Sequence, residues 1–296
     1  MGRCLIGLAL LAGACNATAD LPAETTDANT GIDSSTPGID AAPDALVLGP
    51  WGAPAKIIGA SSTILTEDDG SLSSTTLELV FAVLDTVNGG KDLYYTTRPS
   101  PTAAWMTPAP LGFNLVGLTE ETPRFSDDDL TLYFASNRVA ANGLDIYRVT
   151  RSAVGSAWTQ PAVVVGPNST ANEKWFTPCG GQRYLVIVGG DIAEGKLGSG
   201  APTVVASLSA PAANETGTFL AQDCLTTYFA SIRSGTNQIY TSTRIGSNDP
   251  WPAPTLVMDF PMIGSNQEDP WISPDQRTFV FASDVSGTKD LYLSVR

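Results

Sequence analysis

Short runs in which apolar and polar residues alternate recur along most of this chain. The most regular run has two apolar residues followed by Phe-Ala, and it occurs as "LVFAV", "LYFAS", "TYFAS" and "FVFAS" around Phe81, Phe134, Phe229 and Phe281. A degraded copy, "LVIVG", surrounds Ile187. Alternation with a period of two, bounded by Gly, Asn, Asp and Pro, predicts β-strands joined by tight turns. No segment has a helical period.

In most units two further phrases follow this run in the same order. The second phrase is a strand ending in Arg in "DLYYTTR", "DIYRVTR", "QIYTSTR" and "DLYLSVR", which begin at Asp92, Asp145, Gln238 and Asp290. The third phrase combines Trp and Pro and begins at Trp105, Trp158 and Trp251. Each unit of about 50 residues thus holds about four short strands, which is typical of a propeller blade. The five copies predict an all-β fold, a single five-bladed β-propeller.

The first and last units complement each other. The last copy has no third phrase, because the sequence stops at Arg296, whereas an orphan third phrase, "WGAPAKI", stands at Trp51 to Ile57. We therefore predict that this N-terminal strand completes the last blade and closes the ring. In the third unit the Trp phrase is missing, so we expect its third strand at Thr203 to Leu208 and no outer strand.

The N-terminal segment is unlike the repeats. Residues 1–14 combine Arg3, an apolar run and small residues before Cys15, which predicts a lipoprotein signal peptide with Cys15 as the lipidated residue; ordinary secretion is the alternative. Residues 15–46 are rich in Ala, Thr, Ser, Pro and Asp, which predicts a disordered acidic tether. The propeller is then expected over residues 47–296.

Charge and composition exclude several function classes. The chain has 16 Lys and Arg against 30 Asp and Glu, a formal net charge of −14, so a nucleic-acid partner is not expected. It contains no histidine, which excludes Ser-His-Asp and Cys-His catalysis and His metal sites. An enzyme built on this sequence would have to use carboxylates, Tyr, Lys or Cys.

The repeats resemble a known family. The copies "ETPRFSDDDLTLYFASNR" and "EDPWISPDQRTFVFASD" resemble the WD40-like repeats of TolB-type periplasmic propellers and of bacterial envelope lipoproteins, and the resemblance covers Trp51 to Arg296. It implies a monomeric, non-catalytic binding or scaffolding module at the cell envelope, facing the periplasm or held at the outer membrane. Its partner would be another envelope or periplasmic protein, without a cofactor, and only the lipid anchor would contact the membrane.

The alternative function is a carboxylate-dependent glycoside hydrolase or a carbohydrate-binding propeller. Such an enzyme needs an acid and a base or nucleophile with separated pKa values. The acids of this sequence recur at one blade position, and that repetition favours a structural role.

One set of repeated acids is the candidate binding rim. Counting back thirteen or fourteen residues from each core Phe or Ile gives Glu67, Glu121, Glu173, Glu215 and Glu268. We expect all five at the start of the innermost strand of their blade. There they could form an acidic mouth for a cation or a basic segment of a partner, or accept backbone N–H bonds that fix the ring.

Other noticeable residues have two readings each. Cys179 and Cys224 lie in adjacent units and could form a disulfide or remain two buried thiols. The three Trp of the third phrase could stack on sugars, but packing between blades is expected. The runs "TEDDG" and "SDDDL" lack the ligand spacing of a calcium loop, so no metal site is expected.

Overall fold

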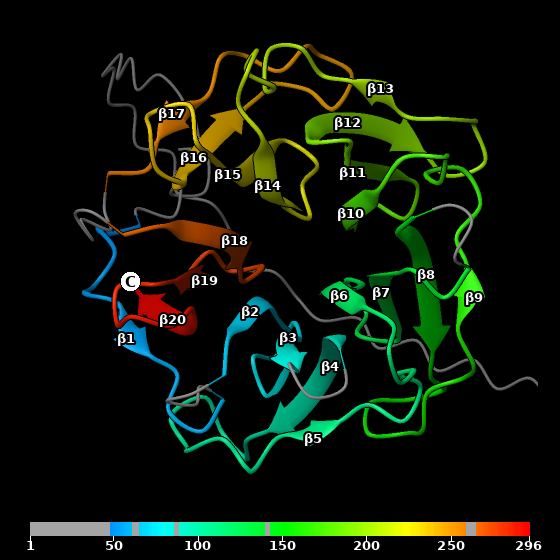
Figure 1. Cartoon of the computed structure of the whole chain (residues 1–296). Coiled ribbons are helices and arrows are strands. Elements are labelled where there is room, and N and C mark those ends of the chain that lie inside the picture. Colours follow the sequence, from blue (N-terminus) through cyan, green and yellow to red (C-terminus); the bar gives the residue numbers. More distant parts are fainter. Residues whose placement is uncertain (1–47, 61–64, 86–88, 140–142, 259–264) are drawn as a thin grey trace, which may run out of the picture. The chain divides into compact units, whose positions relative to one another are not determined.

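The repeated phrases form antiparallel sheets in the computed structural model, which describes residues 48–60, 65–85, 89–139, 143–258 and 265–296. These residues contain twenty strands in five four-stranded sheets, within one compact unit, Leu48–Arg296. The sheets stand around a central axis as five blades (Figure 1), so the predicted five-bladed propeller is confirmed. Residues 1–47, with Cys15 and the predicted tether, lie outside the described residues. Within the described part of the chain, no helix has the length and hydropathy needed to cross a membrane.

Each blade contains four strands, listed here from the axis outward. Blade 1 has β2 (Glu67–Leu72), β3 (Glu78–Asp85), β4 (Gly90–Thr97) and β5 (Ala109–Pro110), and blade 2 has β6 (Glu120–Phe125), β7 (Thr131–Ser136), β8 (Asp145–Thr150) and β9 (Ala162–Val163). Blade 3 has β10 (Glu173–Cys179), β11 (Arg183–Val188), β12 (Asp191–Lys196) and β13 (Thr203–Val204). Blade 4 has β14 (Glu215–Leu220), β15 (Thr226–Ser231), β16 (Gln238–Thr243) and β17 (Thr255–Leu256). Blade 5 has β18 (Gln267–Ile272), β19 (Thr278–Ser283), β20 (Asp290–Val295) and β1 (Ala55–Lys56).

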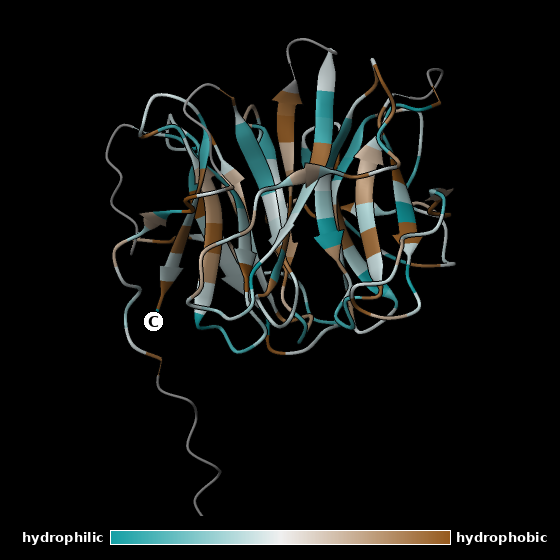
Figure 2. Cartoon of the chain, turned by 90° about the horizontal axis from the view of Figure 1, so that it is seen from below, coloured by the Kyte–Doolittle hydropathy of each residue, from teal (hydrophilic) through white to brown (hydrophobic). Residues whose placement is uncertain are grey.

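The Phe-Ala phrase is the second strand of its blade, and both of its faces are buried. In β7, Leu132 and Phe134 pack in one cluster with residues of blade 1, whereas Tyr133 and Ala135 pack in another with residues of blade 3. Successive side chains of a strand point to opposite faces, so one apolar phrase fills the spaces on both sides of its blade. Figure 2 shows the resulting apolar bands along the strands.

The N-terminal strand closes the ring as predicted. Strand β1 pairs with β20, with Ala55 opposite Leu293. Next to it, the ring of Trp51 lies 5.4 Å from that of Phe279, and the guanidinium of Arg296 lies 4.0 Å from the Trp51 ring. The two ends of the described unit are therefore held in one blade, beside the label of the C-terminus in Figure 1.

Our expectation for blade 3 is wrong. Its third strand is β12, and Thr203–Val204 is the outer strand β13, so this blade also has four strands. Strand β12 contains Gly195 where an alternating pattern would place a side chain. A Cβ there would lie 2.3 Å from Cζ of Tyr184, so the glycine makes room for the buried tyrosine ring. The pattern is therefore lost although the strand is kept.

Candidate functional site

The five predicted rim glutamates occupy two different positions of the innermost strands. Glu67, Glu173 and Glu215 are first residues of their strands, whereas Glu121 and Glu268 are second residues. Neighbouring residues of a strand point to opposite sides. The prediction of one equivalent ring is therefore wrong, because counting back thirteen or fourteen residues allowed a slip of one position.

Two of the glutamates at the first position, Glu173 and Glu215, are held by their own blade and by the loop that enters it. Glu215 accepts hydrogen bonds from Ser231 Oγ at 3.0 Å and the Ala210 N–H at 3.2 Å, and pairs with Arg233 at 3.0 Å. Glu173 accepts bonds from the hydroxyl and the N–H of Ser169. Burial raises the pKa of both carboxyls. These glutamates fix the start of the innermost strand, and their donors come from the strand's own surroundings rather than from the next blade.

Carboxylates at the second position and lysines beside them form a network around the axis. Lys91 Nζ lies 2.8 Å from Asp68 and 3.2 Å from Glu121, and Lys174 lies 2.6 Å from Glu121. Lys289 joins Glu268 at 2.7 Å. This end of the propeller, here called the charged mouth, is therefore a lysine–carboxylate network rather than a free acidic rim.

The third residue of each innermost strand links the blades to one another. All five of these residues have positive φ, between 49° and 58°: Asp69, Thr122, Trp175, Gly217 and Asp269. In three of them the backbone N–H group donates to the preceding blade. Asp69 donates to Asp269 at 3.4 Å, Thr122 to Asp69 at 3.3 Å, and Trp175 to Thr122 at 3.2 Å. At the same position of blade 4, Gly217 lies close against blade 5, and a Cβ there would lie 2.5 Å from Asp269 Cα.

Two adjacent carboxyls in the charged mouth differ strongly in acidity. Burial and the charge of Asp69 raise the pKa of Asp68 to about 7. Burial acts on Asp69 too, but Lys91 and Lys289 outweigh it and hold the pKa of Asp69 at about 2. Among the described residues, no group of three or more Asp, Glu, Cys or His side chains is arranged to hold a metal ion.

A buried arginine closes the axis below this ring. Arg124 Nη1 donates to the Gly70 carbonyl at 3.1 Å and Nη2 to the Pro270 carbonyl at 3.0 Å, and its guanidinium lies 5.5 Å from the Phe219 ring. Arg124 is 1% exposed. It therefore spans from blade 2 to blades 1, 4 and 5 and separates the charged mouth from the other end of the axis.

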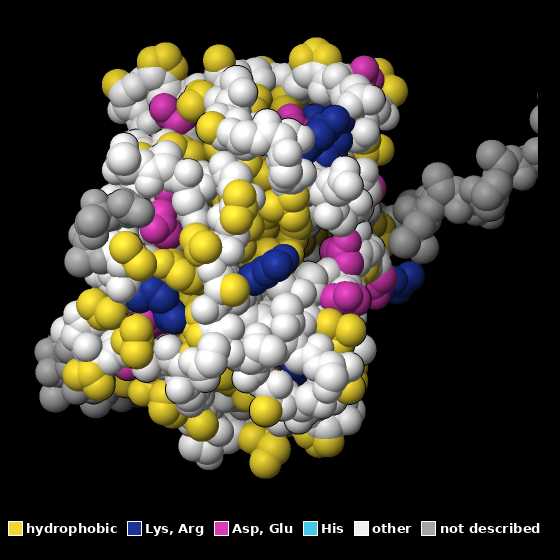
Figure 3. All heavy atoms as spheres, turned by 90° about the vertical axis from the view of Figure 1, so that its right-hand side faces the viewer, with side chains coloured by type: hydrophobic (Ala, Val, Ile, Leu, Met, Phe, Trp, Pro, Cys, Tyr) yellow, Lys and Arg dark blue, Asp and Glu magenta, His cyan; other side chains and the backbone are white. Residues whose placement is uncertain are grey.

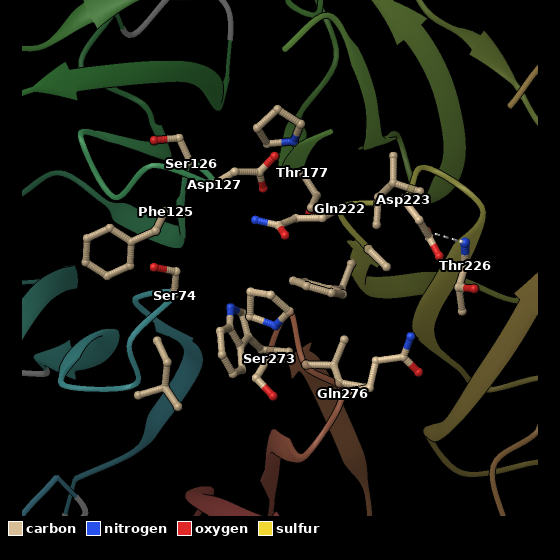
Figure 4. A pocket seen from close by; sticks show the side chains of 18 of the residues that line it. Ser74, Phe125, Ser126, Asp127, Thr177, Gln222, Asp223, Thr226, Ser273 and Gln276 are labelled. Carbon is tan, nitrogen blue, oxygen red and sulfur yellow. Dashed lines mark hydrogen bonds between the residues drawn. The ribbon is translucent and has the colours of Figure 1, made fainter. Parts of the chain in front are cut away.

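That other end is a cavity of about 120 Å³, here called the axial cup, to which all five blades contribute. Its floor and walls are mainly apolar and aromatic; they include the buried Leu72, Thr177, Phe219 and Trp271 and the half-buried Phe125 and Tyr228. Its rim is exposed and includes Ser74, Asp127, Gln222, Asp223, Pro274 and Gln276. Figure 4 shows these groups converging from different blades, with Asp127 and Gln222 pointing toward each other.

The carboxyls of the cup are not equivalent. Asp129 accepts bonds from the Ser74 N–H at 2.8 Å and hydroxyl at 2.6 Å, and Asp223 accepts the N–H groups of Leu225 and Thr226. Partial burial raises the pKa of Asp127, although a hydrogen bond from the Gln222 side chain opposes the shift. Asp127 is thus the cup carboxyl that is best placed to meet a ligand.

The predicted disulfide residues lie behind one wall of the cup. The structure joins Cys179 to Cys224 with an S–S bond, with Cα atoms 5.6 Å apart, well within the range of a bridge. Their chain neighbours Pro178 and Asp223 both line the cup. The bond therefore ties the blade 3 part of the wall to the blade 4 part.

The three Trp of the third phrase are covered by arginines. The guanidinium that ends the third strand lies over the Trp ring of the same blade at 4.0–4.5 Å, in the pairs Arg98–Trp105, Arg151–Trp158 and Arg244–Trp251. Trp251 also donates to Glu194 of blade 3 at 3.1 Å. The "TR" and Trp phrases therefore belong to one packing unit. On the side of the molecule seen in Figure 3, hydrophobic side chains reach the surface and charged ones form small separate groups.

Sequence reasoning missed the cup and the lysines. In the turn "SDDDL", Asp128 accepts its own turn's Leu130 N–H at 3.0 Å, whereas its neighbour Asp127 faces the cup. Lys91 and Lys289 both stand directly before the Asp of the second phrase. This repeated Lys-Asp pair indicated that lysines would lie beside the carboxylates of the mouth.

Comparisons with known proteins support the fold. No family model and no curated protein sequence matches this chain. An endo-arabinase from Bacteroides thetaiotaomicron is 11% identical, with a TM-score of 0.56, over 82% of this chain and 97% of that chain. An α-L-arabinofuranosidase from Podospora anserina, solved with cellotriose, is 12% identical, with a TM-score of 0.55, over 83% of this chain and 96% of that chain. A protein described as TolB from Agrobacterium tumefaciens is 16% identical, with a TM-score of 0.49, over 78% of this chain and 76% of that chain. At these identities the likeness concerns the fold and not the activity.

Proposed function

We propose that this chain is a non-catalytic binding module of the bacterial cell envelope, and that the axial cup receives part of a partner protein. The observation that carries the proposal is the cup itself, a cavity built by all five blades with an aromatic floor and a polar rim. A concave site with an apolar lining and a few convergent polar groups is the common form of a binding site. The charged mouth at the opposite end has its carboxylates already paired with lysines.

A glycoside hydrolase is the second candidate. Asp68 and Asp69 have the separated pKa values that such an enzyme needs. Both carboxyls are buried, at 3% and 1% exposure, and lysines cover them. A retaining or inverting glycosidase must bring two carboxyls about 5–9.5 Å apart against a bound sugar. Asp68 and Asp69 are too deeply buried for that access, so we favour binding.

Reducing-sugar assays on arabinan and xylan separate the two candidates. We expect no release above that of the Asp68→Asn, Asp69→Asn double variant. Hydrolysis by the wild type that this variant loses would establish the enzyme instead.

Display at the envelope rests on the N-terminal sequence. Cys15→Ser, expressed in a bacterial host that processes lipoproteins, should move the protein from the detergent phase to the aqueous phase. Equal partitioning of wild type and variant into detergent would contradict a lipid anchor at Cys15.

Capture of partners tests the cup directly. Gln222 is exposed on the rim, so Gln222→Tyr narrows the opening without changing charge. Gln160→Tyr makes the same change at an exposed position away from the cup. Pull-downs from an envelope extract should lose a partner with Gln222→Tyr and keep it with Gln160→Tyr. The same partners at the same levels with both variants would contradict a role for the cup.

A further inference from the structure

The size of the axial cup limits what can enter it. Its volume is about 120 Å³. Pockets that enclose a small-molecule ligand are commonly about 300–1,000 Å³. The cup therefore suits the end of one side chain, while the rest of that segment lies across the exposed rim.

The charge of the cup indicates which charge that side chain should carry. Among the described residues that line it there are three aspartates, Asp127, Asp129 and Asp223, and none is Lys or Arg. Asp129 is bonded to Ser74 of blade 1 and Asp223 to its own turn, which leaves the Asp127 carboxyl at the opening. A carboxylate in a partly apolar cavity is stabilised by a cation that enters with it.

The lining also offers aromatic faces. Phe125, Tyr228 and Trp271 line the cavity beside the rim. Lysine and arginine bind such faces through cation–π contacts, and their aliphatic stems pack against apolar walls. Two buried cations lie behind the lining and are already compensated: Asp69 and Asp269 offset the charge of Arg124, and Glu78 pairs with Arg151.

We propose that the cup takes one lysine or arginine side chain from an extended segment of the partner protein. This inference rests on the proposed function and names the chemistry of its ligand. The ammonium or guanidinium group meets the Asp127 carboxylate, the stem lies against the aromatic wall, and the peptide backbone meets the polar rim.

Short peptides test the charge requirement. The probes are N-acetylated, C-amidated Gly-Gly-Lys-Gly-Gly, its arginine and norleucine counterparts, and free n-butylamine, titrated into the Leu48–Arg296 unit and followed by NMR at residues 221–223 and the Trp271 indole. We expect the lysine and arginine peptides to bind at least about tenfold more tightly than norleucine, as for a charge-assisted contact. Norleucine binding as tightly as lysine would overturn the proposal. Butylamine binding more tightly than the lysine peptide would overturn the assignment to a protein segment.

Two matched variants locate the contact. Asp127→Asn should weaken binding of the lysine peptide about tenfold, whereas Asp275→Asn should leave that affinity unchanged. Asp275 occupies the corresponding turn of blade 5 but accepts bonds from Ser273 and Arg277 of its own turn and does not line the cup. Equal losses with both variants, or no loss with Asp127→Asn, would overturn the proposal. If Gln222→Tyr blocks partner capture but Asp127→Asn does not, the cup remains the site and its ligand is not cationic.

The pH dependence gives an independent readout. Protonation of Asp127 removes the charge that holds the cation, so affinity should fall as the solution becomes more acidic than the raised pKa of Asp127. The other titratable or charged groups near the cup are Asp128, Asp129, Asp223, Tyr228, Arg124 and Arg151. The dependence of affinity on pH should disappear in Asp127→Asn, and a dependence that persists in this variant would contradict the contact.

Discussion

Single side chains determine how the charged mouth is neutralised. Asp68 and Asp69 are neighbours in one strand, yet their pKa values are about 7 and about 2. Burial penalises both charges; the negative charge of Asp69 raises the pKa of Asp68 further, whereas Lys91, Lys289 and a hydrogen bond from Trp175 lower the pKa of Asp69. The mouth therefore carries carboxyls that titrate at very different pH.

Stability should reflect the raised pKa of Asp68. A carboxyl whose pKa is about 7 when folded and about 4 when unfolded stabilises the fold below pH 4 and loses that contribution as pH rises to 7. Burial also raises the pKa of Asp269 well above its usual value, and the Asp68→Asn variant keeps that contribution. We expect the wild-type Tm to fall between pH 5 and 7.5 and the fall to be smaller in Asp68→Asn, as measured by thermal melts. Parallel curves for the two proteins would contradict the assignment.

The buried pair between blades 1 and 2 gives a second test at this scale. Arg151 bonds both oxygens of Glu78 at 2.7 Å, and their side chains are 1% and 5% exposed. Arg151→Ala leaves a buried carboxylate and should cost about 3–5 kcal/mol in urea unfolding. Arg98 makes the same Trp stack and Nε–H bond in blade 1, so Arg98→Ala is the matched control and should cost clearly less. Equal costs would show that the ion pair adds nothing.

At the scale of elements, the sequence predicts strands well where both faces of a blade are apolar. The Phe-Ala phrase marks β3, β7, β15 and β19 because one strand fills the spaces on both sides of its blade. The sequence pattern does not predict β12, where Gly195 replaces a side chain and makes room for Tyr184. It also fails to fix positions along β6 and β18, because a one-residue slip changes the side to which Glu121 and Glu268 point. The cup depends on turn residues from five blades and has no pattern of its own.

The Cys179–Cys224 disulfide bond ties blade 3 to blade 4. Removing it frees a loop of 45 residues in the unfolded chain, so the Cys179→Ser, Cys224→Ser variant should lose about 2–4 kcal/mol in urea unfolding. Dithiothreitol should destabilise the wild type and leave the variant unchanged. Two thiols that react with a maleimide in the unfolded, unreduced Leu48–Arg296 chain, whose cysteines are Cys179 and Cys224, would contradict the bond.

At the scale of the whole molecule, ring closure depends on strand β1. It contributes the outer strand of blade 5 and brings Trp51 onto Phe279 and Arg296. A chain that begins at residue 59 should therefore melt at a lower temperature than one that begins at Leu48. Full-length protein and the Leu48 chain should melt together. Equal melting of all three would show that closure does not stabilise the propeller.

The central claim is that the axial cup is where this propeller meets its partner. Photo-cross-linking in the living cell tests it most directly, with Gln222→p-benzoylphenylalanine on the rim and Gln160→p-benzoylphenylalanine away from it. A discrete adduct with another protein from position 222, absent from position 160 and lost when Asp127→Asn is added, is the predicted result. No adduct from position 222, or the same adduct from both positions, would contradict the claim.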